Sequence, residues 1–138
     1  MTQDNTALGA FLLRITLGGV MLAHGLVLKL MTFGLAGTMG FFGSLGFPPV
    51  LGAVVALAET AAGIALILGI WVRPVSLLLL PILLGATWQH LGQGWLFSAP
   101  GGGWEFPLVL VMMALAQAAL GAGAFALRLP AAVRPKAA

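Results

Sequence analysis

The chain has 138 residues, of which 61% are hydrophobic and 7% charged, and its mean hydropathy is +1.12. Soluble domains are about 45–50% apolar and about 25% charged, so this composition excludes a water-exposed globule. The net charge of +3 is too small for the basic surface that nucleic-acid binding needs. The absence of cysteine excludes disulfides, thiolate metal sites and iron–sulfur clusters. We therefore expect one integral membrane domain over residues 1–138.

Four apolar runs are long enough to cross a bilayer, which takes about 20 apolar residues. Proline, glycine and arginine punctuate the sequence between them, at 48–49, 73–74 and 100–103. The runs cover residues 7–28, 50–71, 74–91 and 107–127. No Lys or Arg precedes the first run and no small-residue cleavage site follows it, so we expect this run to be retained and not removed as a signal peptide.

An uncharged segment over residues 31–47 links the first two runs. It contains too many glycines to span and is too apolar for an exposed loop. Its apolar residues follow helical spacing, which predicts a short interfacial or re-entrant helix over 36–44. An irregular loop lying on the bundle is the alternative. The expected fold class is therefore an all-α membrane protein, a four-transmembrane-helix bundle with this short helix between the first and second spans.

The positive charges predict the orientation. Four spans place both termini and the 71–74 connection on one side. That side carries Arg73, Arg128, Arg134 and Lys136, whereas the opposite side carries only Lys29. We therefore expect a multi-pass protein with both termini in the cytoplasm. The outer interface then holds Trp88, Trp95 and Trp104.

Each predicted span has a face of small or polar residues, the kind that lets membrane helices pack closely. The face of the first span consists of Arg14, Gly18, Met21 and Gly25. That of the second span consists of Gly52, Ala56, Glu59 and Gly63. The face of the third span consists of Pro81, Gly85, Trp88 and Gln89. That of the fourth span consists of Glu105, Met112, Ala116, Ala119 and Gly123. We expect these faces to meet inside the bundle.

Arg14 and Glu59 are the two deep charges, roughly 10 Å and roughly 14 Å from opposite ends of their helices at about 1.5 Å per residue. A lone charge near the bilayer centre costs about 2.5–3.5 kcal/mol on insertion scales. We therefore predict a buried Arg14–Glu59 ion pair. The pair would serve either as a structural contact that sets the register of two helices or as a proton or headgroup site.

Further polar groups gather in the outer half and form, with Glu59, a candidate ligand site. Its residues are His24, Glu59, Gln89, His90, Trp104 and Glu105. Imidazoles, an acid and aromatic rings could hold a quinone headgroup, whose carbonyls accept hydrogen bonds and whose ring stacks. The alternative is an ordinary interfacial belt of polar side-chain tips.

Haem and copper are disfavoured as cofactors, and no metal site is predicted. His24 and His90 could ligate a haem, but both lie near one interface. Met21 and His24 could bind copper with His90 or another methionine, since thioether and imidazole suit that metal, but methionines in an apolar chain mostly serve packing. No catalytic set is recognisable, so the sequence leaves open whether the chain is an enzyme.

The sequence resembles the DoxX family of small four-helix bacterial membrane proteins. The resembling segments are LLRITLGGVMLAHG at 12–25, FGLAGTMGFFGSLGFPP at 33–49, LAETAAGIALILGIWVR at 57–73, LGATWQHLGQGW at 84–95 and GGGWEFPL at 101–108. By the family's pattern the polar signature positions are Arg14, His24, Gly25, Glu59, Trp104 and Glu105. Many members place a lysine four residues after the histidine, whereas Lys29 is five after His24, so we leave Lys29 out of the predicted site.

The resemblance implies a function in membrane redox chemistry. The family name comes from subunits associated with a terminal quinol oxidase, and related proteins are linked to a thiosulfate:quinone oxidoreductase and to thiol-redox membrane complexes. We therefore expect a bacterial inner-membrane subunit that works with membrane or periplasmic redox partners and binds a quinone near the periplasmic face. A non-catalytic scaffold or assembly protein, and a small-solute or metal transporter, are the alternatives.

Overall fold

The computed structural model describes residues 3–127, which are all helix, turn or loop. The helices are α1 (Gln3–Leu22), the π-helix η1 (Ala23–Thr32), α2 (Gly34–Ser44), α3 (Pro49–Leu68), α4 (Val72–His90), the 3₁₀-helix η2 (Leu91–Gln93) and α5 (Glu105–Leu120). The predicted inner-side charges Arg128, Arg134 and Lys136 lie outside the described residues.

Three helical segments are long and apolar enough to cross a membrane: Asp4–Thr32, Pro49–Leu68 and Val72–Gln93. The fourth apolar helix, α5, is shorter, at 16 residues. The prediction that this helix continues to residue 127 is wrong, because the chain leaves helical geometry at Gly121, where φ is +82°. The short helix expected over 36–44 is present as α2, over Gly34–Ser44.

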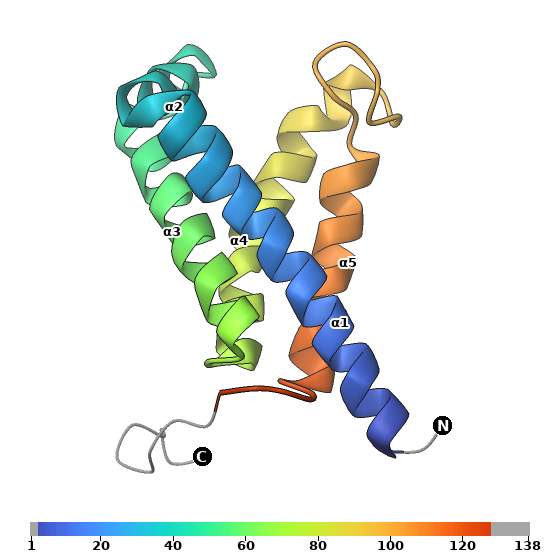
Figure 1. The fold of residues 1–138 in the computed structure, drawn as a ribbon. Helices are drawn as coiled ribbons and strands as arrows, with labels where there is room; N and C mark the ends of the chain where they lie inside the picture. Colours follow the sequence, from blue (N-terminus) through green and yellow to red (C-terminus); the bar gives the residue numbers. More distant parts are fainter. Residues whose placement is uncertain (1–2, 128–138) are drawn as a thin grey trace.

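Figure 1 shows the ends of the bundle. The start of α1, the turn between α3 and α4, and residues 121–127 lie at one end, which we call the base. The helix α2 and the loop over 94–104 lie at the other end, which we call the top. In this view α1 crosses the bundle diagonally, and α3 and α4 diverge from their turn at the base towards the top.

Helices α1 and α3 pack through glycine, as the sequence predicts. A Cβ atom on Gly25 would lie 2.6 Å from the backbone nitrogen of Thr60, and one on Gly63 would lie 2.7 Å from the backbone nitrogen of Leu22. Both predicted faces of these two helices are buried, Arg14 and Ala56 completely. Close backbone approach is the means by which membrane helices associate where lipid provides no hydrophobic drive.

Helices α4 and α5 pack differently, and both predicted faces there are wrong. Trp88 and Met112 are 64% and 60% exposed, and Pro81, Gly85, Ala116 and Ala119 also face outward. The buried residues are Val72, Ser76, Leu79 and Leu83 on α4, and Pro107, Leu110, Val111, Ala114 and Gln117 on α5. Leu79, Leu83, Leu110 and Val111 form much of this contact, and the small residues of the predicted faces lie outside it.

Candidate functional site

Arg14 stabilises the base of the bundle. Its side chain is fully buried, and its Nη1 donates hydrogen bonds to the carbonyl oxygens of Leu66 at 2.8 Å and Ile67 at 2.9 Å. Its Nη2 donates to the carbonyl oxygen of Ala124 at 2.9 Å. Two of these acceptors are among the last carbonyls of α3, the negative end of the helix dipole, where a cation is favoured.

Arg14 therefore does not form the predicted ion pair with Glu59, and that prediction is wrong. Side chains on an α-helix lean towards the helix N-terminus. Helices α1 and α3 are antiparallel, with the N-terminus of α1 at the base and that of α3 at the top (Figure 1). The two side chains consequently lean in opposite directions. The alternative function of a transporter gated by an Arg14–Glu59 pair is therefore not supported.

Glu59 pairs instead with Lys29, whose Nζ lies 2.6 Å from Oε2 of Glu59. The side chains are 17% and 7% exposed for Lys29 and Glu59, so the pair is largely removed from the surroundings. The carbonyl oxygen of Lys29 also accepts a hydrogen bond from Oγ1 of Thr38 on α2, at 2.7 Å. Lys29, left out of the predicted site, therefore joins η1 to α3 and α2 and balances the charge of Glu59.

The π-helix η1 changes the angle between His24 and Lys29. Residues five apart in an α-helix are separated by about 140° around the axis, since each residue turns about 100°. In a π-helix the hydrogen bonds run between residues five apart, so these residues are closer in angle than in an α-helix. His24 and Lys29 have this spacing within η1. Sequence spacing alone cannot reveal this, because regular α-helical geometry is the default expectation.

The imidazole of His24 points from η1 towards α5. It stacks on the ring of Phe106, with ring centroids 6.1 Å apart and an interplanar angle of 27°. Its Nδ1 lies 2.9 Å from the carbonyl oxygen of Val20. A carbonyl oxygen only accepts, so Nδ1 carries the hydrogen and Nε2 of the neutral ring is left as an acceptor.

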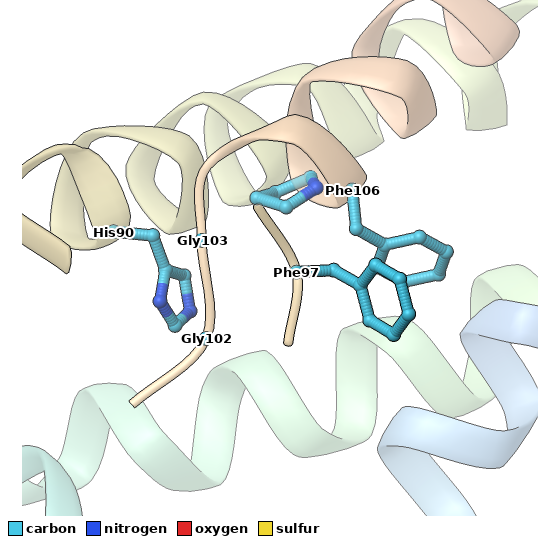
Figure 2. A pocket seen from close by; sticks show the side chains of 6 residues that line it. His90, Phe97, Gly102, Gly103 and Phe106 are labelled. Carbon is cyan, nitrogen blue, oxygen red and sulfur yellow. The ribbon is translucent and has the colours of Figure 1, made fainter. Parts of the chain in front are cut away.

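Phe106 also lines an open pocket at the top of the bundle, with a volume of about 270 Å³. Its walls come from the end of α4, the 94–104 loop and the start of α5. The lining residues are His90, Phe97, Gly102, Gly103, Phe106 and Pro107. In Figure 2 the backbone of Gly102 and Gly103 runs between His90 on one side and the rings of Phe97 and Phe106 on the other. The Nδ1 atom of His90 is buried and has no hydrogen-bond partner.

The loop that forms this pocket is fixed by backbone hydrogen bonds. The amides of Trp104 and Glu105 donate to the carbonyls of Gly94 and Trp95, at 3.1 and 3.0 Å. A Cβ atom on Gly103 would collide with the carbonyl oxygen of Leu96. Gly102 has φ of +79°, and a Cβ there would lie 3.4 Å from Cε1 of His90. The positive φ favours glycine at this position, whereas a Cβ there would make only an ordinary contact with the histidine ring.

The remaining predicted site residues are only partly gathered. Gln89, Trp104 and Glu105 are half-buried and adjoin pocket residues in the sequence. Within residues 3–127 their side chains form no hydrogen bond or ion pair. Glu59 lies with Lys29 at the contact of α3 with η1, apart from the pocket lining. Sequence reasoning missed Phe97 and Phe106, although aromatic residues next to Glu105 and a glycine run were the available signal.

The described residues include no group of three or more His, Asp or Glu side chains placed to hold a metal ion. Met21 is 1% exposed and belongs to the apolar core, together with Leu17 and Leu66.

A model of the DoxX family matches residues 9–92. The chain belongs to the DoxX family. The match includes Arg14, His24, Lys29, Glu59 and His90 and ends before the 94–104 loop and α5. The chain is also similar to the Bacillus subtilis (strain 168) protein named "Putative oxidoreductase CatD", with 37% identity over 79 residues. That alignment covers 57% of each of the two chains, and no solved structure matches this chain.

Proposed function

We propose that this DoxX-family chain is an accessory subunit of a quinone-linked respiratory or redox complex in the bacterial inner membrane. It binds a quinone ring in the pocket at the top of the bundle. The observation that carries this proposal is the imidazole of His90, which lines an open, aromatic-lined pocket of about 270 Å³ and whose Nδ1 is buried without a partner. A buried polar atom left unpaired costs about 1–3 kcal/mol, so a shift of the His90 ring that lets a ring oxygen of the ligand reach Nδ1 would be favourable.

The other pocket residues suit a flat ring. Phe97 and Phe106 offer aromatic faces, and pairs of such rings gain about 0.5–1.5 kcal/mol beyond area burial. Gly102 and Gly103 present backbone without side chains, which lets a planar group lie close. The chain has no cysteine and no tyrosine, which leaves tryptophan and methionine as its redox-active side chains, so electron transfer would need the bound ring and a partner protein. The name of the similar B. subtilis protein, an oxidoreductase, agrees with this reaction class.

The orientation of the site follows from the positive-inside rule. Arg73 is exposed at the start of α4, at the base, and the pocket lies at the opposite end. Cytoplasmic flanks carry the excess of Lys and Arg. We therefore place the base and both termini in the cytoplasm, α5 as a fourth span, α2 in the outer interface and the pocket at the periplasmic face.

The test is to purify the protein from membranes, extract it with organic solvent and quantify the quinone that copurifies. We expect a stoichiometric quinone in the wild type and a loss of most of it in His90→Leu. Thr16→Val is the matched control, because Thr16 is exposed on α1 and bonds only within its own helix, to Leu12. A wild-type protein free of quinone would refute the proposal, as would a His90→Leu variant with unchanged content.

A scaffold or assembly protein is the second candidate function. It is favoured by the way in which the deep charges are satisfied inside the chain: Arg14 by three backbone carbonyls and Glu59 by Lys29. Such contacts stabilise a bundle without any ligand. The same extraction discriminates the two candidates, since a scaffold has no need of a stoichiometric quinone.

A further inference from the structure

Two buried polar atoms near the base of the bundle have no hydrogen-bond partner among residues 3–127. They are Oγ of Ser76 on α4 and Oε1 of Gln117 on α5, and both side chains are fully buried. Buried polar atoms in proteins are nearly always hydrogen-bonded, either to protein or to an ordered water. The requirement is stricter in a membrane, because lipid tails offer neither donors nor acceptors.

The amide of Gln117 has a fixed orientation. Its Nε2 donates a hydrogen bond to the carbonyl oxygen of Gly121, at 2.7 Å. The reverse orientation would set the amide oxygen against that carbonyl oxygen, and two acceptors form no hydrogen bond. Oε1 is therefore an unused acceptor on the buried face of α5.

The hydroxyl group of Ser76 differs from those of three threonines on the long helices. The hydroxyls of Thr16, Thr60 and Thr87 each donate to the carbonyl oxygen four residues earlier in the same helix. That bond satisfies a hydroxyl group without any partner outside the helix. Within the described part of the chain Ser76 makes no such bond to Val72. Its hydroxyl can therefore donate or accept across the helix contact.

The base of the bundle sets the register of Ser76 and Gln117. Helices α4 and α5 are antiparallel, and α4 begins where α5 ends (Figure 1). Arg73 contacts the end of α5, since a Cβ atom on Gly121 would lie 3.2 Å from Nε of Arg73. Ser76 follows Arg73 by roughly 4.5 Å along α4, at about 1.5 Å per residue. Gln117 precedes Gly121 by roughly 6 Å along α5. The two residues thus lie at similar heights.

The top of the bundle gives the same register. There a Cβ atom on Gly102 would lie 3.4 Å from Cε1 of His90. The chain from His90 back to Ser76 and the chain from Gly102 on to Gln117 are nearly equal in length. Both contacts therefore place Ser76 opposite Gln117, between the two helices.

The chemistry of the two atoms selects the class of ligand. Ser76 is the smallest side chain on the buried face of α4, which otherwise consists of Val72, Leu79 and Leu83, so hydrocarbon fills this part of the contact least. A ligand here must accept from a hydroxyl group and donate to an amide oxygen. An anion only accepts, and a calcium or magnesium ion needs about six oxygen ligands. Water both accepts and donates.

We propose that a water molecule is bound between α4 and α5 near the base, accepting a hydrogen bond from Oγ of Ser76 and donating one to Oε1 of Gln117. Buried waters of this kind join polar groups that a protein does not pair directly. This water links the two helices whose opposite ends form the pocket. The water site is independent of the proposed quinone binding.

The test is solid-state NMR of isotopically labelled protein in liposomes, with the carbon-bound hydrogens replaced by deuterium. Magnetisation is transferred from water to the side-chain carbons. We expect a signal at Cδ of Gln117 and none at the methyl carbons of Leu83, which is buried on the same face of α4 as Ser76. A Gln117 carbon that receives no magnetisation would refute the proposal.

Ser76→Thr and Ser76→Val form a matched pair of variants. Their side chains have nearly the same shape, and only threonine keeps the hydroxyl group. The amide of Gln117 keeps its bond to Gly121 in both variants, so exchange of its own hydrogens with water is the same. We expect the transfer to Gln117 to persist in Ser76→Thr and to be lost in Ser76→Val. Equal transfer in the two variants would overturn the proposal.

A direct hydrogen bond between Ser76 and Gln117 is the competing arrangement. It would give no transfer from water, although the chemical shift of Cδ of Gln117 would still differ between the two variants. That result would also overturn the proposal. The measurement on the wild type needs no variant, so it decides even where a substitution prevents folding. None of these outcomes bears on the pocket at the top of the bundle.

Discussion

The Lys29–Glu59 pair can be tested by a double-mutant cycle, for which the structure predicts how much each substitution lowers the free energy of unfolding. The two charged atoms lie 2.6 Å apart, and the side chains are 17% and 7% exposed. Removing one partner of a buried pair leaves an uncompensated charge and typically lowers the free energy of unfolding by about 3–5 kcal/mol. Lys29 remains slightly accessible, so we expect about 3 kcal/mol for Lys29→Met and for Glu59→Leu, at the lower end of that range.

The double variant should recover most of this loss, because neither charge then needs a partner. Replacing a buried pair with apolar residues is often neutral or stabilising. We expect an interaction free energy of at least about 2 kcal/mol, measured by equilibrium unfolding in mixed micelles with increasing denaturing detergent. The same cycle on Arg14→Met and Glu59→Leu is the control. These residues do not pair, so their effects should add within about 0.5 kcal/mol.

Two results would refute this reasoning. Additive losses in the Lys29–Glu59 cycle would show that the pair does not form in the membrane. A large coupling between Arg14 and Glu59 would show that Arg14 leaves the carbonyls at the base and that the helix geometry described here is wrong.

Two further predictions concern helix contact and topology. Gly25→Ala should lower the free energy of unfolding by about 1–3 kcal/mol, because its Cβ would lie 2.6 Å from a backbone nitrogen of α3. Gly19→Ala, with nothing within 4 Å, is the matched control and should be neutral or stabilising by up to about 1 kcal/mol; equal losses in both variants would contradict the close contact. The chain has no native cysteine, so single cysteines report topology cleanly. Ser98→Cys should react with an impermeant maleimide in intact cells and Asn5→Cys only after lysis, and the reverse pattern would move the pocket to the cytoplasm.

Helix positions and the contact between α1 and α3 could be predicted from the sequence. Gly18 and Gly25 lie on one face of α1 and η1, and Gly63 lies on the facing side of α3; in lipid such faces are where backbones approach. The same rule failed for α4 and α5. There Leu79, Leu83 and Leu110 form the contact, and a row of leucines is indistinguishable in sequence from a lipid-facing surface. Periodicity identifies a face but not what covers it.

Only part of the pocket could be predicted from the sequence. His90 was identified as a polar group of the outer half, whereas the lining rings of Phe97 and Phe106 were missed. The role of the 94–104 loop could not be predicted, because the shape of this loop depends on positive-φ glycines and on backbone hydrogen bonds between residues about ten apart. Such contacts leave no periodic signal in the sequence.

The sequence by itself determined that this is a helical membrane protein and that its two deep charges, Arg14 and Glu59, must be satisfied within the protein. The reason is that hydrocarbon offers no solvation to a guanidinium or a carboxylate. Only the tertiary structure decided which groups satisfy them. Arg14 and Glu59 lean towards opposite ends of antiparallel helices, so Arg14 donates to the carbonyls at the base, and Lys29 of η1 pairs with Glu59.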